Sequence, residues 1–198
     1  MDTPSAHPLH IEPATGLLTR TRQVLSTHFD ARPAGSVAEL IVVHCISLPP
    51  GQYGGPWIEQ LFTGTLPRDH HPYFATIPTG RVSAHVLIRR DGTPVQFVPF
   101  GARAWHAGVS QYLGRPACND FSIGIELEGT DETAFEEAQY ATLAAVIRAL
   151  LRTYDTLDAT RIVGHNDIAP GRKLDPGTKF DWPRLRAAVS AATPIVPP

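Results

Sequence analysis

Two short predicted strands that end in histidine constrain the fold of this chain more than any other feature of its sequence. Leu40–His44 has no polar residue before its histidine, and Thr160–His165 is a second short segment that ends in histidine. An uninterrupted apolar run is typical of a strand buried on both faces, because a half-exposed strand alternates apolar and polar residues. We therefore expect a sheet that is covered on both sides, with a histidine at the end of each of these strands.

The other elements predict that this sheet is mixed. Ala84–Arg89 and Pro94–Val98 flank Asp91-Gly92, which tolerates the positive φ angles of a tight turn, so an antiparallel hairpin is expected. Strands in a hairpin and around a long helix favour the α/β (mixed) class. The predicted helices are a weak one within residues 16–28, a short one over residues 57–62, a long one with a capping box at Thr133 and Glu136, and a last one capped by Asp181.

No repeat or linker divides the chain, and its 198 residues suit one domain. Residues 1–36 are polar and rich in Pro and Thr, so we expect an arm that lies on a domain of residues 37–192. Residues 193–198 are expected to form a tail. Residues 63–80, which contain His70-His71, are predicted to be a long surface loop, and loops of that length are often functional.

The composition argues against several classes of protein. A formal net charge of −2 disfavours a protein that binds nucleic acid mainly through phosphates, although local basic patches stay open. Nineteen prolines and sixteen glycines exclude a coiled coil. No stretch approaches the roughly 18 apolar residues of a membrane span, and no secretory signal is visible. We expect a cytoplasmic monomer that binds neither nucleic acid nor membrane, with Cys45 and Cys118 as reduced thiols.

His44 and His165 are candidate metal ligands, because strand ends hold side chains rigidly at the edge of a sheet. The Pro- and Gly-rich loop after His165 returns Asp175. Two imidazoles and one carboxylate are a typical catalytic zinc set, which leaves a fourth position for water. Spacing alone is a weak signal, since no compact metal motif is present and hydrogen-bonded rim histidines are commoner. Other histidines that could be the ligands are His70, His71, His85 and His106.

Glu126 is the strongest candidate for a general base. Ser122–Glu128 alternates strictly, so Glu126 and Glu128 share one strand face with Gly124, which leaves space for a substrate. Partial burial would raise the pKa of Glu126 toward the range of a proton carrier. The commoner alternative is a solvated strand face. Lys173 lies close in sequence to the candidate aspartate ligand and could stabilise an oxyanion, or it is a surface charge.

Longer motifs point to one family. They read LIVVHCISLPPG, YGGPWIEQLFTGTL, HPYF, RVSAHVLIRRDG, VQFVPF, RAWHAGVS, CNDFSIGIELEGTD and GHNDIAPGRKLDPG. From about Leu40 to Trp182, their content and order closely resemble the zinc N-acetylmuramoyl-L-alanine amidase family, which includes a phage lysozyme and the peptidoglycan recognition proteins. The first 36 residues share little with the family.

The resemblance implies a central mixed sheet with flanking helices and Zn2+ as the cofactor. It makes His44, His165 and Asp175 the zinc ligands, and it places Glu126 and Lys173 at the catalytic positions. The implied substrate is a muropeptide from cell-wall turnover, cut between the lactyl group of 1,6-anhydro-N-acetylmuramic acid and L-alanine. It also implies a link to β-lactamase induction, because uncut muropeptides act as the inducing signal.

Four more residues are candidates for substrate contacts. Trp105 offers a flat apolar face to the sugar or peptide, or is a core tryptophan. Arg81, Arg172 and Asn119 could bind peptide carboxylates and amides, since the guanidinium fork suits a carboxylate, or each could be structural. The positions that depart from the family pattern, and so leave the carboxylate contacts open, are Ala117, Gly171 and Leu174.

Two other functions are alternatives to a cytoplasmic enzyme. Some relatives bind peptidoglycan fragments without cutting them after losing a zinc ligand, whereas all of the implied ligands and Glu126 and Lys173 are present here. A secreted or lipid-anchored amidase would need an export signal or a lipobox cysteine, and neither is visible. These features favour an enzyme of cell-wall recycling.

Overall fold

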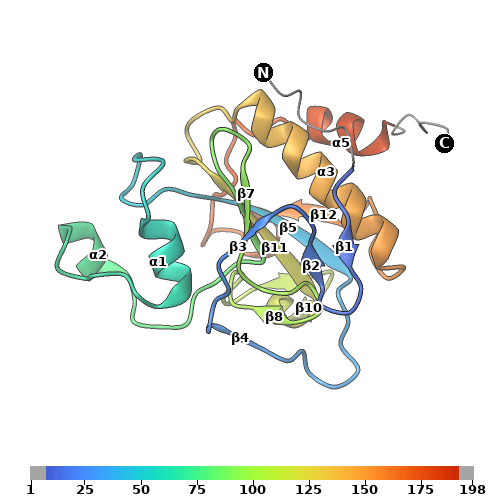
Figure 1. The fold of residues 1–198 in the computed structure, drawn as a ribbon, viewed down its shortest axis with the longest axis horizontal. Helices are drawn as coiled ribbons and strands as arrows, with labels where there is room; N and C mark the ends of the chain where they lie inside the picture. The colour runs from blue at the N-terminus through green and yellow to red at the C-terminus, as the bar shows by residue number, and fades with distance from the viewer. Residues whose placement is uncertain (1–7, 192–198) are drawn as a thin grey trace.

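The computed structural model describes residues 8–191, and its centre is a six-stranded sheet (Figure 1). All neighbouring strands in it are parallel except β6 and β7, which form the expected hairpin, and the mixed α/β class is confirmed. From edge to edge the strands are β12 (Ile162–Gly164), β5 (Leu40–Ile46), β11 (Ser122–Glu128), β6 (Val86–Ile88), β7 (Pro94–Gln96) and β3 (Arg22–Gln23).

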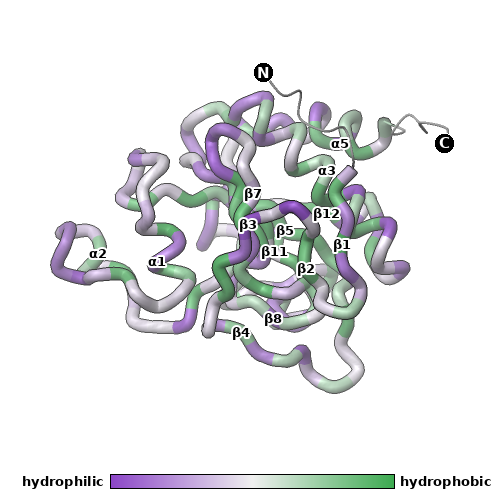
Figure 2. The backbone as a smooth tube through the Cα atoms, in the orientation of Figure 1, coloured by the Kyte–Doolittle hydropathy of each residue, from purple (hydrophilic) through white to green (hydrophobic). Residues whose placement is uncertain are grey.

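Helices cover both faces of the sheet. On one face, Ile125 of β11 shares a core cluster with residues of α3 (Glu137–Thr153) and α5 (Trp182–Ser190). On the other, Leu87 of β6 shares a second cluster with the helices α1 (Trp57–Thr63) and α2 (Pro72–Thr76). Figure 1 shows these two pairs of helices on opposite sides of the strands, and Figure 2 shows the hydrophobic colour concentrated along the central strands.

Strands β5 and β11 are buried along most of their paired length, because helices cover one face and the residues around the site cover the other. Residues 40–44 of β5 and every residue of β11 are buried, so the expectation of strands covered on both faces is confirmed. Burial also rules out the solvated strand face that was the alternative for Glu126 and Glu128. One detail was wrong: β5 continues to Ile46, so His44 does not end it.

Residues 16–28 contain no helix, which corrects the weak helix expected there. They hold β2 (Leu17–Leu18), paired antiparallel with β1 (Ile11–Glu12), and the edge strand β3. Tertiary contacts override the local pattern, since the backbone amide of the buried Leu18 donates to the side chain of Gln96 at 2.6 Å. The segment expected to be an arm therefore contributes a strand to the central sheet.

The long helix begins later than the sequence suggested. The capping box is formed by Glu136 and Gln139, whereas the Thr133 hydroxyl contacts that of Thr130. The cap by Asp181 is confirmed, because its carboxylate accepts from the backbone amide of Arg184 at 3.0 Å.

Shorter elements complete the description. Their bounds are β4 (Phe29–Asp30), which pairs with β8 (Arg103–Ala104), the hairpin β9 (Gln111–Tyr112) and β10 (Arg115–Pro116), the 3-10 turn η1 (Cys118–Asp120), and α4 (His165–Ile168). Cys45 and Cys118 are free thiols, as expected. Within residues 8–191 no helix is long and apolar enough to cross a bilayer. The expected tail, residues 193–198, lies outside the described residues.

Candidate metal and catalytic site

The site is built on the central strands of the sheet. In the parallel pair β11 and β5, Glu126 lies opposite His44, and both side chains are on the face away from α3. Strand β12 lies on the other side of β5 and leads directly into α4, whose first residue is His165. The loop after α4 then returns to this edge, where the backbone amide of Asn166 donates to the carbonyl of Asp175 at 3.0 Å.

Three donor atoms converge at this point. His44 Nδ1 lies 3.0 Å from His165 Nδ1, and each of these nitrogens lies 3.0 Å from Asp175 Oδ2. Only 1% of His44 and 4% of His165 are exposed. Among the described residues, these three form the one group of His, Cys, Asp and Glu side chains that is arranged to hold a metal ion. His70, His71, His85 and His106, the rival ligands, are outside it.

The proton positions of His165 support a ligand role. Its Nε2 lies 3.1 Å from the carbonyl oxygen of Ala107, which can only accept, and 3.3 Å from Arg172 Nη2. A hydrogen on Nε2 satisfies this carbonyl and leaves the lone pair of Nδ1 for a metal. Arg172 donates to the same carbonyl at 2.7 Å and to that of Val109 at 2.7 Å. A histidine that donates one ring N–H to a backbone carbonyl is the usual arrangement for a metal ligand.

The donor set fits a divalent cation, and zinc in particular. Burial lowers the pKa of His44 to about 4, so its imidazole is neutral near pH 7 and keeps a lone pair for a metal. An imidazole lone pair and a carboxylate oxygen at 3.0 Å repel each other unless a proton or a cation lies between them. Two imidazoles and one carboxylate leave a coordination position open, which is typical of catalytic rather than structural zinc sites.

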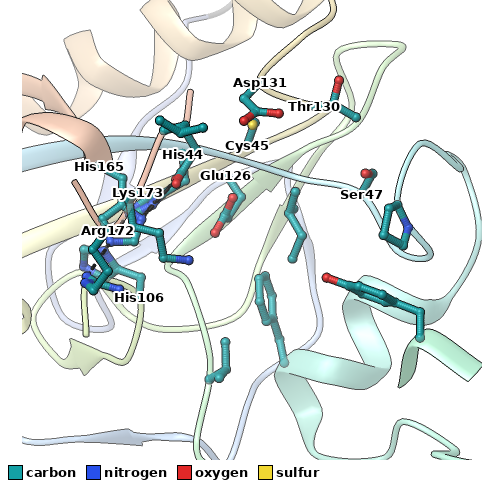
Figure 3. A pocket seen from close by; sticks show the side chains of 18 residues that line it. His44, Cys45, Ser47, His106, Glu126, Thr130, Asp131, His165, Arg172 and Lys173 are labelled. Carbon is teal, nitrogen blue, oxygen red and sulfur yellow. Dashed lines mark hydrogen bonds and ion pairs between the residues drawn. The ribbon is translucent and has the colours of Figure 1, made fainter. Parts of the chain in front are cut away.

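A cavity of about 480 Å³ opens beside this cluster (Figure 3). His44, His165 and Asp175 line it together with Glu126, Lys173 and Arg172. In Figure 3 the carboxylate of Glu126 and the amino group of Lys173 face the same open space from different elements, one from β11 and one from the loop after α4. The structure therefore brings together all five residues that the resemblance implied for metal binding and catalysis.

Glu126 has the surroundings of a proton carrier. Only 8% of the residue is exposed, and its Oε2 has no hydrogen-bond partner among the described residues. Burial, followed by the charge of Asp175, raises the pKa of Glu126 well above its usual range, as expected from the sequence. A carboxylate that is buried, unsatisfied and exposed to a cavity is able to exchange a proton with a bound molecule.

The four candidate substrate contacts are distributed differently. Arg172 lines the cavity, although its guanidinium also donates to the carbonyls described above. Trp105, Arg81 and Asn119 are not among the lining residues. A role for them in substrate binding therefore stays a prediction.

Each of these three side chains has a contact within the protein that explains its position. Trp105 Nε1 and Arg81 both donate to the carboxylate of Asp30, at 3.0 Å in each case. Asn119 Oδ1 accepts from the backbone amides of His106 and Ala107, at 3.1 and 2.8 Å. Asn119 thereby holds the loop whose carbonyl at position 107 fixes His165.

Sequence reasoning gave no role to several residues of the cavity wall. They include Ser47, Tyr73, Thr130 and Asp131. These residues lie inside the longer motifs, but the motifs do not show which of their side chains face the cavity. His106, which was considered only as a rival ligand, lies behind His44 with its Nδ1 2.9 Å from His44 Nε2.

Comparison with known proteins places the chain in context. The N-acetylmuramoyl-L-alanine amidase family matches residues 33–178. The 1,6-anhydro-N-acetylmuramyl-L-alanine amidase AmpD of Escherichia coli is 61% identical over 178 residues, which are 90% of this chain and 97% of that protein. The family match over residues 33–178 includes every residue of the site described above.

Solved structures agree with this similarity. A crystal structure of a selenomethionine derivative of AmpD has a TM-score of 0.87 and 58% identity, covering 91% of this chain and 99% of that one. The amidase AmiD from E. coli, in complex with the substrate anhydro-N-acetylmuramic acid-L-Ala-D-gamma-Glu-L-Lys, has a TM-score of 0.56 and 25% identity. That match covers 91% of this chain and 65% of AmiD.

Proposed function

Because the chain belongs to the N-acetylmuramoyl-L-alanine amidase family, we propose that it cuts 1,6-anhydromuropeptides between the lactyl group of the sugar and L-alanine. The observation that carries this proposal is the single cavity shared by Glu126, Lys173 and the cluster of His44, His165 and Asp175. A relative named for this activity at 61% identity and a similar fold solved with an anhydromuramyl peptide support the choice of substrate.

Glu126 acts as the proton carrier in the proposed reaction. Its carboxylate, which lines the cavity, accepts a proton from the attacking water and later gives it to the nitrogen of the leaving L-alanine. Its raised pKa suits both steps, because a carboxyl group with an ordinary pKa would hold the proton too weakly near pH 7 to return it to an amine.

The other groups stabilise charge on the carbonyl oxygen. Lys173 faces the same space and would place its ammonium beside the oxyanion that develops on attack. Zn2+ held by His44, His165 and Asp175 would polarise the carbonyl and lower the pKa of a bound water toward about 7. The neutral imidazole of His44 keeps its lone pair for the metal over the physiological pH range.

The biological setting follows from this substrate. We propose a role in the recycling of cell-wall fragments in the cytoplasm, with an influence on β-lactamase induction through removal of the inducing muropeptides. A monomeric state is part of the same proposal.

Mass spectrometry of the purified protein with an anhydromuramyl tripeptide tests the proposal. We expect release of free peptide, loss of that release after treatment with a chelator, and recovery when Zn2+ is added. Asp175→Ala should lose both bound zinc and activity, because two imidazoles alone are a poor site. Conversion that is unaffected by complete metal removal would contradict the zinc-dependent reaction.

The same experiment separates an enzyme from a recognition module. A module would bind the muropeptide, detected by calorimetry, and would leave it intact in the presence of zinc. Intact substrate with measurable binding by the zinc-loaded protein would therefore favour the module over the amidase.

A further inference from the structure

A third buried imidazole, that of His106, lies directly behind the two in the metal cluster. His106 Nδ1 is 2.9 Å from His44 Nε2, and His106 Nε2 is 3.1 Å from the hydroxyl oxygen of Ser122. Both histidines are more than nine-tenths buried. The ring of His106 therefore connects a candidate ligand to the start of β11 with no solvent between them.

The direction of these hydrogen bonds is fixed by a carbonyl at the far end. The Ser122 hydroxyl donates its one hydrogen to the carbonyl of Cys118 at 2.6 Å, so its oxygen must accept from His106 Nε2. A neutral imidazole has one donor and one acceptor nitrogen, so His106 Nδ1 accepts and His44 Nε2 donates. His44 Nδ1 is then left with its lone pair, and it is this atom that faces His165 and Asp175.

The surroundings of His106 hold the ring in this position. A Cβ atom on Gly124 would lie 2.3 Å from His106 Cγ, so only glycine at that position of β11 lets the imidazole lie against the strand. The backbone amide of His106 donates to Asn119 Oδ1 at 3.1 Å. His85 packs edge-on against the ring, with a centroid separation of 5.8 Å.

We propose that His106 is a positioning residue that sets the tautomer and the ring orientation of His44, so that Nδ1 is available to the metal. The proposal rests on the metal site of the proposed function. It gives the two histidine ligands matching support: His165 Nε2 donates to the carbonyl of Ala107, and His44 Nε2 donates through His106 and Ser122 to the carbonyl of Cys118. Partners of this kind typically change metal affinity by about 10-fold to 100-fold when they are removed.

Two amide variants of position 106 separate positioning from simple filling of space. His106→Asn keeps a polar oxygen at the position of Nδ1, next to His44, and loses the partner of Ser122. His106→Gln moves the amide outward to the position of Nε2, next to Ser122, and removes the acceptor of His44. His106→Leu removes both contacts and keeps an apolar side chain in the buried space.

The first measurement is made on metal-free protein in an Asp175→Asn background, so it does not depend on zinc. The amide at position 175 can donate to Nδ1, whereas the carboxylate of Asp175 would compete for the imidazole hydrogen. Nitrogen NMR spectra of isotope-labelled protein report which ring nitrogen of His44 carries the hydrogen. In this background, we expect a single Nε2–H tautomer with His106 or His106→Asn, and a mixture with His106→Gln or His106→Leu. A single Nε2–H tautomer of His44 in all four proteins would overturn the proposal, whether or not zinc binds.

The second measurement is zinc affinity by competition with a chromophoric chelator. We expect His106→Asn to stay within about 3-fold of the wild type, and His106→Gln and His106→Leu to lose about 10-fold to 100-fold. Equal losses in all three variants would indicate a structural role and overturn the proposal. A wild type that binds no zinc would instead refute the metal site. The tautomer measurement would still test the proposed role of His106, because it is made without metal.

A milder variant covers the case in which changes at position 106 prevent folding. Ser122→Ala removes only the hydroxyl that orients His106. We expect mixed tautomers of both His106 and His44 in this variant, with circular dichroism unchanged. Tautomers identical to those of the wild type would overturn the proposed relay.

Discussion

Glu126 and Glu128 are two residues apart on the same face of β11, yet their carboxylates have opposite surroundings. Glu128 accepts from Arg89 at 2.8 Å, from the backbone amide of Gly54 at 2.8 Å and from that of Arg90 at 3.2 Å. Glu126 has a buried oxygen with no hydrogen-bond partner in the described part of the chain. Burial is common to both, so it is the unsatisfied oxygen beside a cavity that distinguishes the candidate for catalysis.

Glu128 instead holds separate parts of the fold together. Its partner Arg89 also donates to Glu59 of α1 at 2.8 Å, so one guanidinium bridges the central strand and a helix. The bond to Gly54 fixes the loop that precedes α1. Both oxygens of the Glu128 carboxylate therefore accept hydrogen bonds within the protein, and neither is available to exchange a proton with a substrate.

Exchanging each carboxylate for an amide should produce the largest difference. Glu126→Gln is expected to lower kcat for an anhydromuropeptide by about 10²–10⁴, because an amide cannot carry the proton. Its zinc content should match that of the wild type, since Glu126 is not one of the three clustered donors. The distinction between the two glutamates would be lost if Glu128→Gln, assayed at a temperature where it is folded, reduced kcat equally.

Lys173 faces the same cavity as Glu126, and Lys179 offers a matched control in this chain. Lys173→Met should lower kcat by about 10²–10³, the usual loss on removal of one oxyanion donor. Lys179, the other lysine of the sequence, is exposed and does not line the cavity. Steady-state kinetics should show no change for Lys179→Met, and similar kinetics for both variants would remove Lys173 from the mechanism.

Stability should be affected more by the change at Glu128 than by the change at Glu126, which is the reverse of the order expected for activity. Glu128→Gln is expected to reduce the free energy of unfolding by about 3 kcal/mol, because it leaves the largely buried guanidinium of Arg89 without one partner. The value lies at the low end for a buried pair, since Glu59 still faces Arg89. Urea denaturation followed by circular dichroism measures this change. A loss smaller than that of Glu126→Gln would show that the contacts of Glu128 are not what stabilises this region.

The pH dependence of stability offers the finest test. Burial raises the folded-state pKa of Glu126 above its unfolded value of about 4.3, so the folded protein binds more protons over the interval between the two values. Stability from this group is complete below about pH 4 and falls as pH rises through the folded-state pKa. Metal-free Glu126→Gln should therefore become more stable than the metal-free wild type as pH rises. A difference in unfolding free energy that is independent of pH would contradict the raised pKa.

Local patterns predicted the elements whose stability is local. The hairpin of β6 and β7 followed from Asp91-Gly92, and the cap of α5 followed from Asp181, because a turn and a cap depend on neighbouring residues. The helix predicted within residues 16–28 was wrong because the structure of this segment depends on distant residues. The amide of Leu18 is satisfied by Gln96, 78 positions away, and no local pattern contains that information.

The candidate site also contains some features that local sequence predicts and others that depend on distant contacts. The residues implied for metal binding and catalysis could be named from motifs, because strands and short loops carry them to one place. The roles of Asn119 and Glu128 depend on which backbone amides come within reach, and so appear only in three dimensions. Gly124 was interpreted as space for a substrate, whereas the structure uses that space for the ring of His106.

The cluster of three donor atoms also couples metal binding to the integrity of the whole fold. It joins His44 to Asp175 across 131 positions of the chain, so no isolated segment contains the site and an unfolded chain cannot present it. By mass action, an ion that binds only the folded state at about 1,000 times its Kd adds about 4 kcal/mol to stability. Metal supply would thus act on the lifetime of the protein as well as on its activity, and chains starved of metal would be the first to unfold and be degraded.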